Sequence, residues 1–183
     1  HVARGLTGTL GLFDWEVVWP PPRGVEPGNP ASVTLLLRGS AGCGSGCLSG
    51  ILLGDLGERE QARLLGAAHP APVDVVKVAH HGSADQSPAL YAALRARVGL
   101  IGVGAGNDYG HPREETLAML AGAGTAAYRT DLDGIVLVAP GVDGAIRVWT
   151  QKAAGGAAED SSAAPGTAGS AAAGSAAGAS LNG

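Results

Sequence analysis

Short apolar runs alternate with polar positions over the first part of the chain. LTGTLGLFDWEVVWPP, residues 6–21, predicts two short strands that end at the prolines of positions 20–22. ASVTLLLRG at 31–39 and CLSGILLGD at 47–55 predict an antiparallel hairpin around a glycine-rich turn. The apolar spacing then lengthens to a helical period, and Glu58 to Leu65 predicts a short amphipathic helix.

Strands and helices alternate after this point. The pattern predicts a strand over 73–78, a helix over 89–97 that Pro88 opens with Ser87 as N-cap, a strand over 98–103, a helix from Pro112 to about Ala121, a short strand AAYRT, and a closing hairpin of GIVLVAP and AIRVWT. The order of elements predicts an α/β fold with a mixed sheet rather than an all-parallel doubly wound sheet.

Composition divides the chain into two parts. Residues 153–183 are nearly all Ala, Gly and Ser, a composition that buries too little apolar surface to order the backbone. We therefore expect one folded domain over residues 1–152 and a disordered tail over 153–183. The net charge of −4 argues against a domain that binds nucleic acid through bulk charge. No apolar run reaches the roughly 18 residues of a membrane span, and no signal peptide is visible.

The two cysteines, Cys43 and Cys47, lie in the glycine-rich turn GSAGCGSGCLSG. This pair offers too few ligands for a zinc site. A disulfide across the turn is one interpretation, but two small, unbonded residues in a hairpin loop is the interpretation that the sequence favours.

Polar side chains follow three of the predicted strands. Asp55 ends GILLGD, His80 and His81 end VVKVAHHG, and His111 lies in the loop after VGLIGVG. Because the carboxyl ends of parallel strands meet at one sheet edge, these side chains are expected to converge. A carboxylate with imidazoles suits zinc, manganese or iron.

Each of these residues also has a structural interpretation. Asp55 could cap the helix that follows it, the histidine pair could cap the helix after Pro88, and His111 could fix a turn before Pro112. Lys77 could simply be exposed. Asp131 and Asp133, in RTDLDG, are most simply turn residues.

Four motifs occur together in one order: L-x-G-D, K-V-x-H-H-G-S, N-x-Y-G-H-P and Y-R-T-D-x-D-G. Over roughly residues 5–150 the chain resembles the C-terminal half of the metallo-β-lactamase-like domain of ComEC competence proteins. This resemblance implies an αββα sandwich within a multi-pass protein of the cell membrane that takes up DNA. It also implies a metal-dependent nuclease or phosphodiesterase with one or two zinc or manganese ions, and DNA and the uptake machinery as partners.

The resemblance also assigns roles to residues. Asp55 matches the metal-bridging aspartate and His81 a metal-ligand histidine, with His80 able to exchange roles with it. His111 is placed near a bound phosphate or as a proton donor to the leaving oxygen, so His80 and His111 are the candidate catalytic residues. Ser83 and Asn107 are the candidates for hydrogen bonds to phosphate oxygens.

The main metal motif of that fold, H-x-H-x-D-H, does not occur in this chain. We expect it upstream of His1, in a longer protein of which this chain is a piece. The alternative is a non-catalytic remnant with a structural or DNA-guiding role. A third interpretation is a hydrolase of another phosphoester or of a lactone.

Overall fold

The computed structural model describes residues 2–43, 46–141 and 144–152. The predicted tail at 153–183 lies outside these residues. The sheets comprise β1 (Thr7–Leu10), β2 (Phe13–Trp19), β3 (Thr34–Gly39), β4 (Gly50–Leu52), β5 (Val75–Lys77), β6 (Val98–Ile101), β7 (Ala126–Arg129), β8 (Val136–Pro140) and β9 (Ile146–Thr150). The helices are α1 (Glu58–Ala68), α2 (Pro88–Leu94), α3 (Glu114–Gly122) and α4 (Thr130–Asp133), with short 3-10 turns at Asn29–Ala31, Ala41–Cys43 and Ala79–Gly82.

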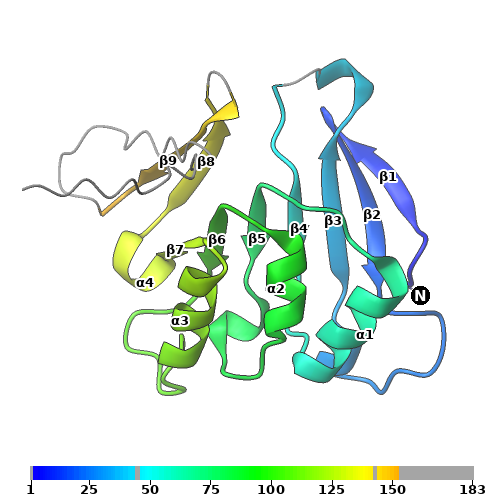
Figure 1. Ribbon diagram of the computed structural model, residues 1–183, viewed down its shortest axis with the longest axis horizontal. Coiled ribbons are helices and arrows are strands. Elements are labelled where there is room, and N and C mark those ends of the chain that lie inside the picture. The colour runs from blue at the N-terminus through cyan, green and yellow to red at the C-terminus, as the bar shows by residue number, and fades with distance from the viewer. Residues whose placement is uncertain (1, 44–45, 142–143, 153–183) are drawn as a thin grey trace, which may run out of the picture.

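Seven strands form one mixed sheet in the order β1-β2-β3-β4-β5-β6-β7, and β8 pairs with β9 in a separate hairpin. Strands β1 to β4 are antiparallel neighbours, whereas β4 to β7 are parallel. Each parallel step is a strand–helix–strand crossover, and consecutive right-handed crossovers in one direction put their helices on the same face. Figure 1 shows α1, α2 and α3 on one side of the sheet. The predicted mixed α/β fold is confirmed.

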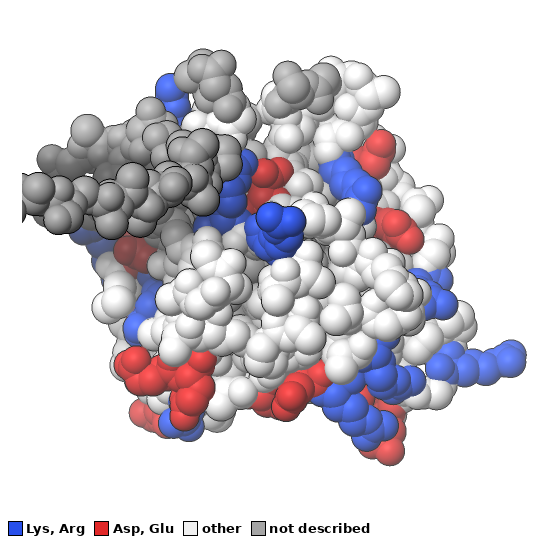
Figure 2. Space-filling model, viewed as in Figure 1, with Lys and Arg blue, Asp and Glu red and all other residues white. Residues whose placement is uncertain are grey.

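The core lies between this sheet and the helices. Leu36, Ile51 and Val76 pair in register across β3, β4 and β5 and are at most 5% exposed. Leu64 of α1 and Leu90 of α2 are fully buried against them. The helical surface is largely uncharged, with acidic and basic side chains interspersed around its margin (Figure 2). This face of the described residues therefore presents no continuous basic surface for a nucleic-acid backbone.

The opposite face of the sheet is also apolar in its central strands. Leu35, Leu52 and Leu100 lie on it in one cross-strand row, with Lys77 between the last two. Leu52 is 36% exposed, and Leu35 and Leu100 are partly exposed. A sheet that faces water on one side usually alternates apolar with polar residues, so an apolar second face is typical of a sheet between two layers.

Element boundaries differ from the predicted ones at several places. The strands predicted over 31–39, 47–55 and 73–78 are shorter and extend only over 34–39, 50–52 and 75–77. The 3-10 turn Asn29–Ala31 precedes the first of them, and the 3-10 turn Ala79–Gly82 follows the last. Helix α2 stops at Leu94, where Arg95 adopts a left-handed conformation (φ 49°). Helix α3 begins at Glu114 rather than Pro112. Helix α1 continues past Leu65 to Ala68, since Ala67 and Ala68 favour a helix.

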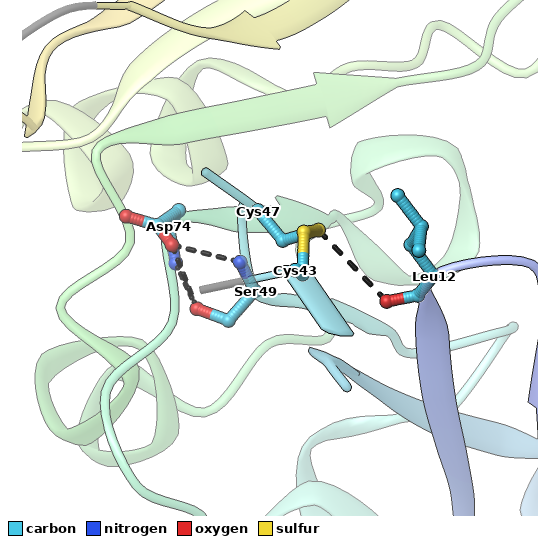
Figure 3. The surroundings of a disulfide bond; sticks show 5 residues. All are labelled: Leu12, Cys43, Cys47, Ser49 and Asp74. Carbon is cyan, nitrogen blue, oxygen red and sulfur yellow. Dashed lines mark hydrogen bonds between the residues drawn. A yellow bond between two sulfur atoms is a disulfide. The ribbon is translucent and has the colours of Figure 1, made fainter. Parts of the chain in front are cut away.

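The cysteines form a disulfide, so the favoured interpretation of two unbonded residues was wrong (Figure 3). The 3-10 turn Ala41–Cys43 reverses the chain and brings the two Cα atoms to 5.8 Å, within the range that a disulfide spans. Gly39 makes room for the bridge, because a Cβ atom there would lie 2.6 Å from the Cβ of Cys47. Disulfides persist chiefly in oxidising compartments.

Candidate functional site at the carboxyl edge of the sheet

The site is built from the turns that follow β4, β5 and β6. Asp55 lies three residues past β4, and His80 and His81 lie in the 3-10 turn after β5. His111 is in the loop after β6. Because these three strands are parallel neighbours, their carboxyl ends share one edge. The predicted convergence of Asp55 with the three histidines is therefore observed.

Asp55 and His81 form the closest pair of candidate ligands. The Nε2 atom of His81 lies 3.9 Å from Oδ1 of Asp55. The other ring nitrogen, Nδ1, lies 2.6 Å from the carbonyl oxygen of Gly102. When the imidazole is neutral, a hydrogen bond from Nδ1 to this carbonyl places the lone pair on Nε2, which is directed toward Asp55. This is the tautomer in which a histidine donates a lone pair to a cation.

Neither residue has the capping role that was its structural alternative. The N-cap of α1 is Gly57, and the backbone N–H of Glu58 donates to Oδ1 of Asp85 at 3.0 Å. Asp85 rather than Asp55 therefore binds the start of that helix. The N-cap of α2 is Ser87, as predicted, although its side chain makes no capping hydrogen bond.

Lys77 belongs to this site, although the sequence left it as a merely exposed residue. Its Nζ atom donates to the carbonyl of Gly54 at 3.1 Å and lies 3.9 Å from Oδ1 of Asp55. Burial lowers the pKa of Lys77, and the charge of Asp55 partly opposes this. The signal that could have identified Lys77 was its place at the end of β5, two residues before the histidine turn.

The three histidines form a row of rings. The centroid of His80 lies 6.4 Å from that of His81 and 5.8 Å from that of His111, both edge to face. The ring of Tyr109, which is 77% exposed, is stacked on His111 at 6.2 Å. The row extends from Asp55 toward the loop of the G-H-P motif, and sequence reasoning had not singled out Tyr109.

His111 is predominantly neutral in these surroundings. Its Nδ1 atom is buried and has no hydrogen-bond partner among the described residues. Burial lowers the pKa of His111, and the nearby charges of Arg113, His80 and His81 lower it further. A protonated His111 is therefore disfavoured at neutral pH, which weighs against the role of proton donor unless a bound anion offsets these charges.

The side chains of Ser83 and Asn107 form hydrogen bonds within the protein. Ser83 is 6% exposed, and its hydroxyl accepts a hydrogen bond from Gln86 at 3.4 Å. The amide of Asn107 donates to the carbonyl of His111 at 2.9 Å and accepts from the backbone N–H of the same residue at 3.1 Å. Asn107 therefore fixes the backbone of the histidine loop, and Ser83 lies beneath the turn rather than at its surface.

The two loops that carry the histidines are packed together through Gly82. Gly82 has a φ of 79°, and a Cβ atom there would lie 2.6 Å from the Cβ of Pro112. The backbone N–H of Arg113 donates to the carbonyl of Gly82 at 2.8 Å. A glycine is needed here both for the left-handed backbone and for the close approach of Pro112.

The donors present do not amount to a complete cation site. Within the described ranges, no group of three or more His, Cys, Asp or Glu side chains is arranged to hold a metal ion. Asp55 and His81 supply two donors, whereas a tetrahedral zinc site needs three or four protein ligands. The described residues by themselves therefore supply too few donors for such a site.

The remaining acidic pair of the sequence analysis has a structural role. Asp131 binds the guanidinium of Arg129 at 2.7 Å, and Oδ2 of Asp133 accepts the backbone N–H of Arg129 at 2.6 Å. Both lie in α4, which turns the chain from β7 toward the β8–β9 hairpin.

None of the described helices has the length and apolar character needed to cross a bilayer.

The chain is similar to a protein of known origin over most of its length. The chain is 28% identical over 137 residues to the ComE operon protein 3 of Bacillus subtilis (strain 168). The matched region is 74% of this chain but 17% of the length of that protein. No protein-family profile and no solved structure matches the chain. The resemblance to competence proteins is therefore supported by similarity to a protein of the ComE operon, whereas the metallo-β-lactamase-like domain has no match among families or structures.

Proposed function

We propose that this chain is part of a DNA-uptake protein and supplies one half of a phosphodiesterase site, in the manner of a metallo-β-lactamase-like nuclease. The observation that carries the proposal is the convergence of Asp55, His80, His81 and His111 at one sheet edge. The similarity to the ComE operon protein 3 supports the DNA-uptake setting. DNA, the uptake machinery and the cell membrane are the proposed partners and location of the whole protein.

The apolar second face of the sheet supports the proposed αββα sandwich. Leu52 and Leu100 lie on that face, and so does Lys77, whose ammonium group reaches the Asp55 turn. The β8–β9 hairpin also exposes apolar side chains, because the cross-strand partners Leu137 and Trp149 are 57% and 52% exposed. A second sheet packed on the face that carries Leu52 and Leu100 would end beside the carboxyl edge of this sheet. It would bring further side chains to Asp55 and His81.

The missing donors belong, in this proposal, to a segment of the native protein outside this chain. Asp55 and His81 would then take part in holding one or two divalent cations, zinc or manganese, which supply a Lewis acid for phosphodiester hydrolysis. His80 and His111 line the adjoining surface, where a phosphodiester would lie. Their cationic neighbour Arg113 suits an anionic substrate.

The test is DNA cleavage by the native full-length protein carrying His81→Asn. Asparagine tolerates the left-handed backbone of His81 (φ 53°), so the fold is expected to survive the change. His69→Asn is the matched control, because His69 has a similar left-handed conformation (φ 43°) at the far end of α1. We expect His81→Asn to lose cleavage by at least about a hundredfold and His69→Asn to retain it. Cleavage that survives His81→Asn would overturn the proposal.

A non-catalytic domain with a structural or DNA-guiding role is the second candidate. It is favoured by the finding that the described residues provide no donor set of three. An H-x-H-x-D-H motif upstream in the native protein supports the nuclease, and its absence supports the non-catalytic domain.

A further inference from the structure

The turn that carries the two candidate histidines has an unfavourable backbone. His80 has φ 46° and ψ 48°, and His81 has φ 53° and ψ 23°, so two consecutive side-chain-bearing residues lie in the left-handed region. Such conformations persist only where the surroundings hold them, and they concentrate at functional sites. The structure must therefore contain contacts that fix this turn.

Gln86 holds both ends of the histidine turn. Its side-chain amide donates to the carbonyl of Ala79 at 3.1 Å and to the carbonyl of Ser83 at 3.0 Å, one residue before and two residues after the histidine pair. Gln86 is 5% exposed, so water does not compete for these bonds. Since both partners are acceptors, the orientation of the amide is fixed.

Tyr91 completes this arrangement from α2. Its hydroxyl donates to Oε1 of Gln86 at 2.7 Å and accepts the backbone N–H of Ala79 at 3.3 Å. Tyr91 is 1% exposed, and burial raises the pKa of its hydroxyl, so it remains a donor. Ala79, the first residue of the histidine turn, is therefore bound at its N–H by Tyr91 and at its carbonyl by Gln86.

Gln61 extends the network to the turn that carries Asp55. Its amide donates to the carbonyl of Leu56 at 2.7 Å and to Oε1 of Gln86 at 2.9 Å, and its own oxygen accepts the backbone N–H of Ser87 at 2.9 Å. Gln61 is fully buried. A backbone hydrogen bond from the N–H of His80 to the carbonyl of Gly54, at 3.0 Å, also joins these two turns.

We propose that Gln61, Gln86 and Tyr91 are positioning residues, which set the Asp55 turn and the His80–His81 turn at the separation that the site requires. The inference rests on the proposed function of that site and names what holds its geometry. Buried polar networks in which every member is satisfied fix one arrangement of the backbone, because an unpaired member is costly. Loss of one member frees the histidine turn to leave its left-handed conformation.

The experiment compares Tyr91→Phe with Thr125→Val in the native protein. Both changes remove one buried hydroxyl, since Thr125 is 4% exposed and donates to the carbonyl of Ala96 at 2.6 Å, away from the site. Amide hydrogen exchange of His80 and Ser83 is the readout, with Val78, whose N–H donates to Leu100, as the reference within the core. Gln86→Leu is a stronger second variant.

We expect Tyr91→Phe to accelerate exchange at His80 and Ser83 by about tenfold relative to Val78, and Thr125→Val to leave this ratio unchanged. The proposal is overturned if the ratio is the same in both variants, since both would then act through global stability alone. We also expect Tyr91→Phe to weaken zinc or manganese binding by the native protein by about tenfold, as changes beneath a ligand do. Faster exchange in a protein that neither binds these ions nor cleaves DNA would support the positioning of the turns and overturn the proposed function.

Discussion

The imidazole of His81 faces the carboxylate of Asp55 across the sheet edge, with Nε2 and Oδ1 3.9 Å apart. The two residues come from turns after neighbouring parallel strands, and neither turn alone determines this separation. The position of each side chain depends on the hydrogen bonds that hold the backbone of its turn. The geometry at this edge is therefore a property of the packed domain.

Gly82→Ala should destabilise the protein. The added Cβ would lie 2.6 Å from the Cβ of Pro112, and the backbone at φ 79° disfavours any side chain. We expect a loss of about 2 kcal/mol or more in the free energy of unfolding. Gly104→Ala is the control, because nothing lies within 4 Å of its added Cβ. Equal urea denaturation midpoints for the two variants would contradict the close packing of the two loops.

Asp74→Asn should make the free energy of unfolding less dependent on pH in the acid range. Burial raises the pKa of Asp74, but hydrogen bonds from Ser49 (Figure 3) and from Arg97 outweigh it, so the pKa lies below 3.8. A lowered pKa means that the carboxylate stabilises the fold above its unfolded pKa and that this contribution is lost as the pH falls through the folded pKa.

We expect Asp74→Asn to cost about 1 kcal/mol at neutral pH, since the pair with Arg97 is partly exposed. The difference from the unaltered protein should narrow as the pH falls below 3.8. Urea denaturation at neutral and at acid pH measures this difference in the free energy of unfolding. A difference that does not change with pH would show that the charge of Asp74 is not involved.

The disulfide makes the fold sensitive to reductant. Bridging Cys43 and Cys47 closes a very short loop, for which the entropic contribution is about 2 kcal/mol. Reduction should lower the thermal midpoint, and the double change to serine should lower it equally and remove the response to reductant. Two free thiols on protein alkylated under non-reducing conditions would refute the bridge.

His111 should titrate below its usual pKa of 6.5, because its surroundings disfavour the charged form. Arg113→Gln removes one of the opposing charges and should raise the pKa of His111. Arg59→Gln, at an exposed position on α1, should leave it unchanged. The pKa of His111 in each variant is measured from the NMR chemical shifts of its ring as the pH is varied around 6.5. A pKa of His111 that Arg113→Gln leaves unchanged would show that the guanidinium does not act on the ring.

Much of the fold followed from local pattern. Helix periodicity at Glu58 and the alternation of apolar runs predicted the element order, and the rule that parallel strands end at one edge predicted that Asp55 would lie near the histidines. Strand lengths were overestimated, because an apolar run such as VDVVKV continues past the point where β5 stops pairing.

Two features of the structure could not be predicted from the sequence. The disulfide depends on the 3-10 turn that reverses the chain after Gly39, which spacing alone does not specify. The network of Gln61, Gln86 and Tyr91 joins residues of two helices and a loop through tertiary packing. Glutamine in an amphipathic helix is usually solvated, so nothing local distinguishes a buried glutamine from an exposed one.

Cation binding tests the central claim most directly, namely that Asp55 and His81 are one half of a site that the rest of the native protein completes. Zinc and manganese binding should be measured by calorimetry and elemental analysis for residues 1–183 and for the full-length protein, each with and without Asp55→Asn. We expect one or two ions in the full-length protein, a loss of binding with Asp55→Asn, and weak binding by residues 1–183 alone. A full-length protein that binds no ion, or that binds it equally with Asp55→Asn, would contradict the account.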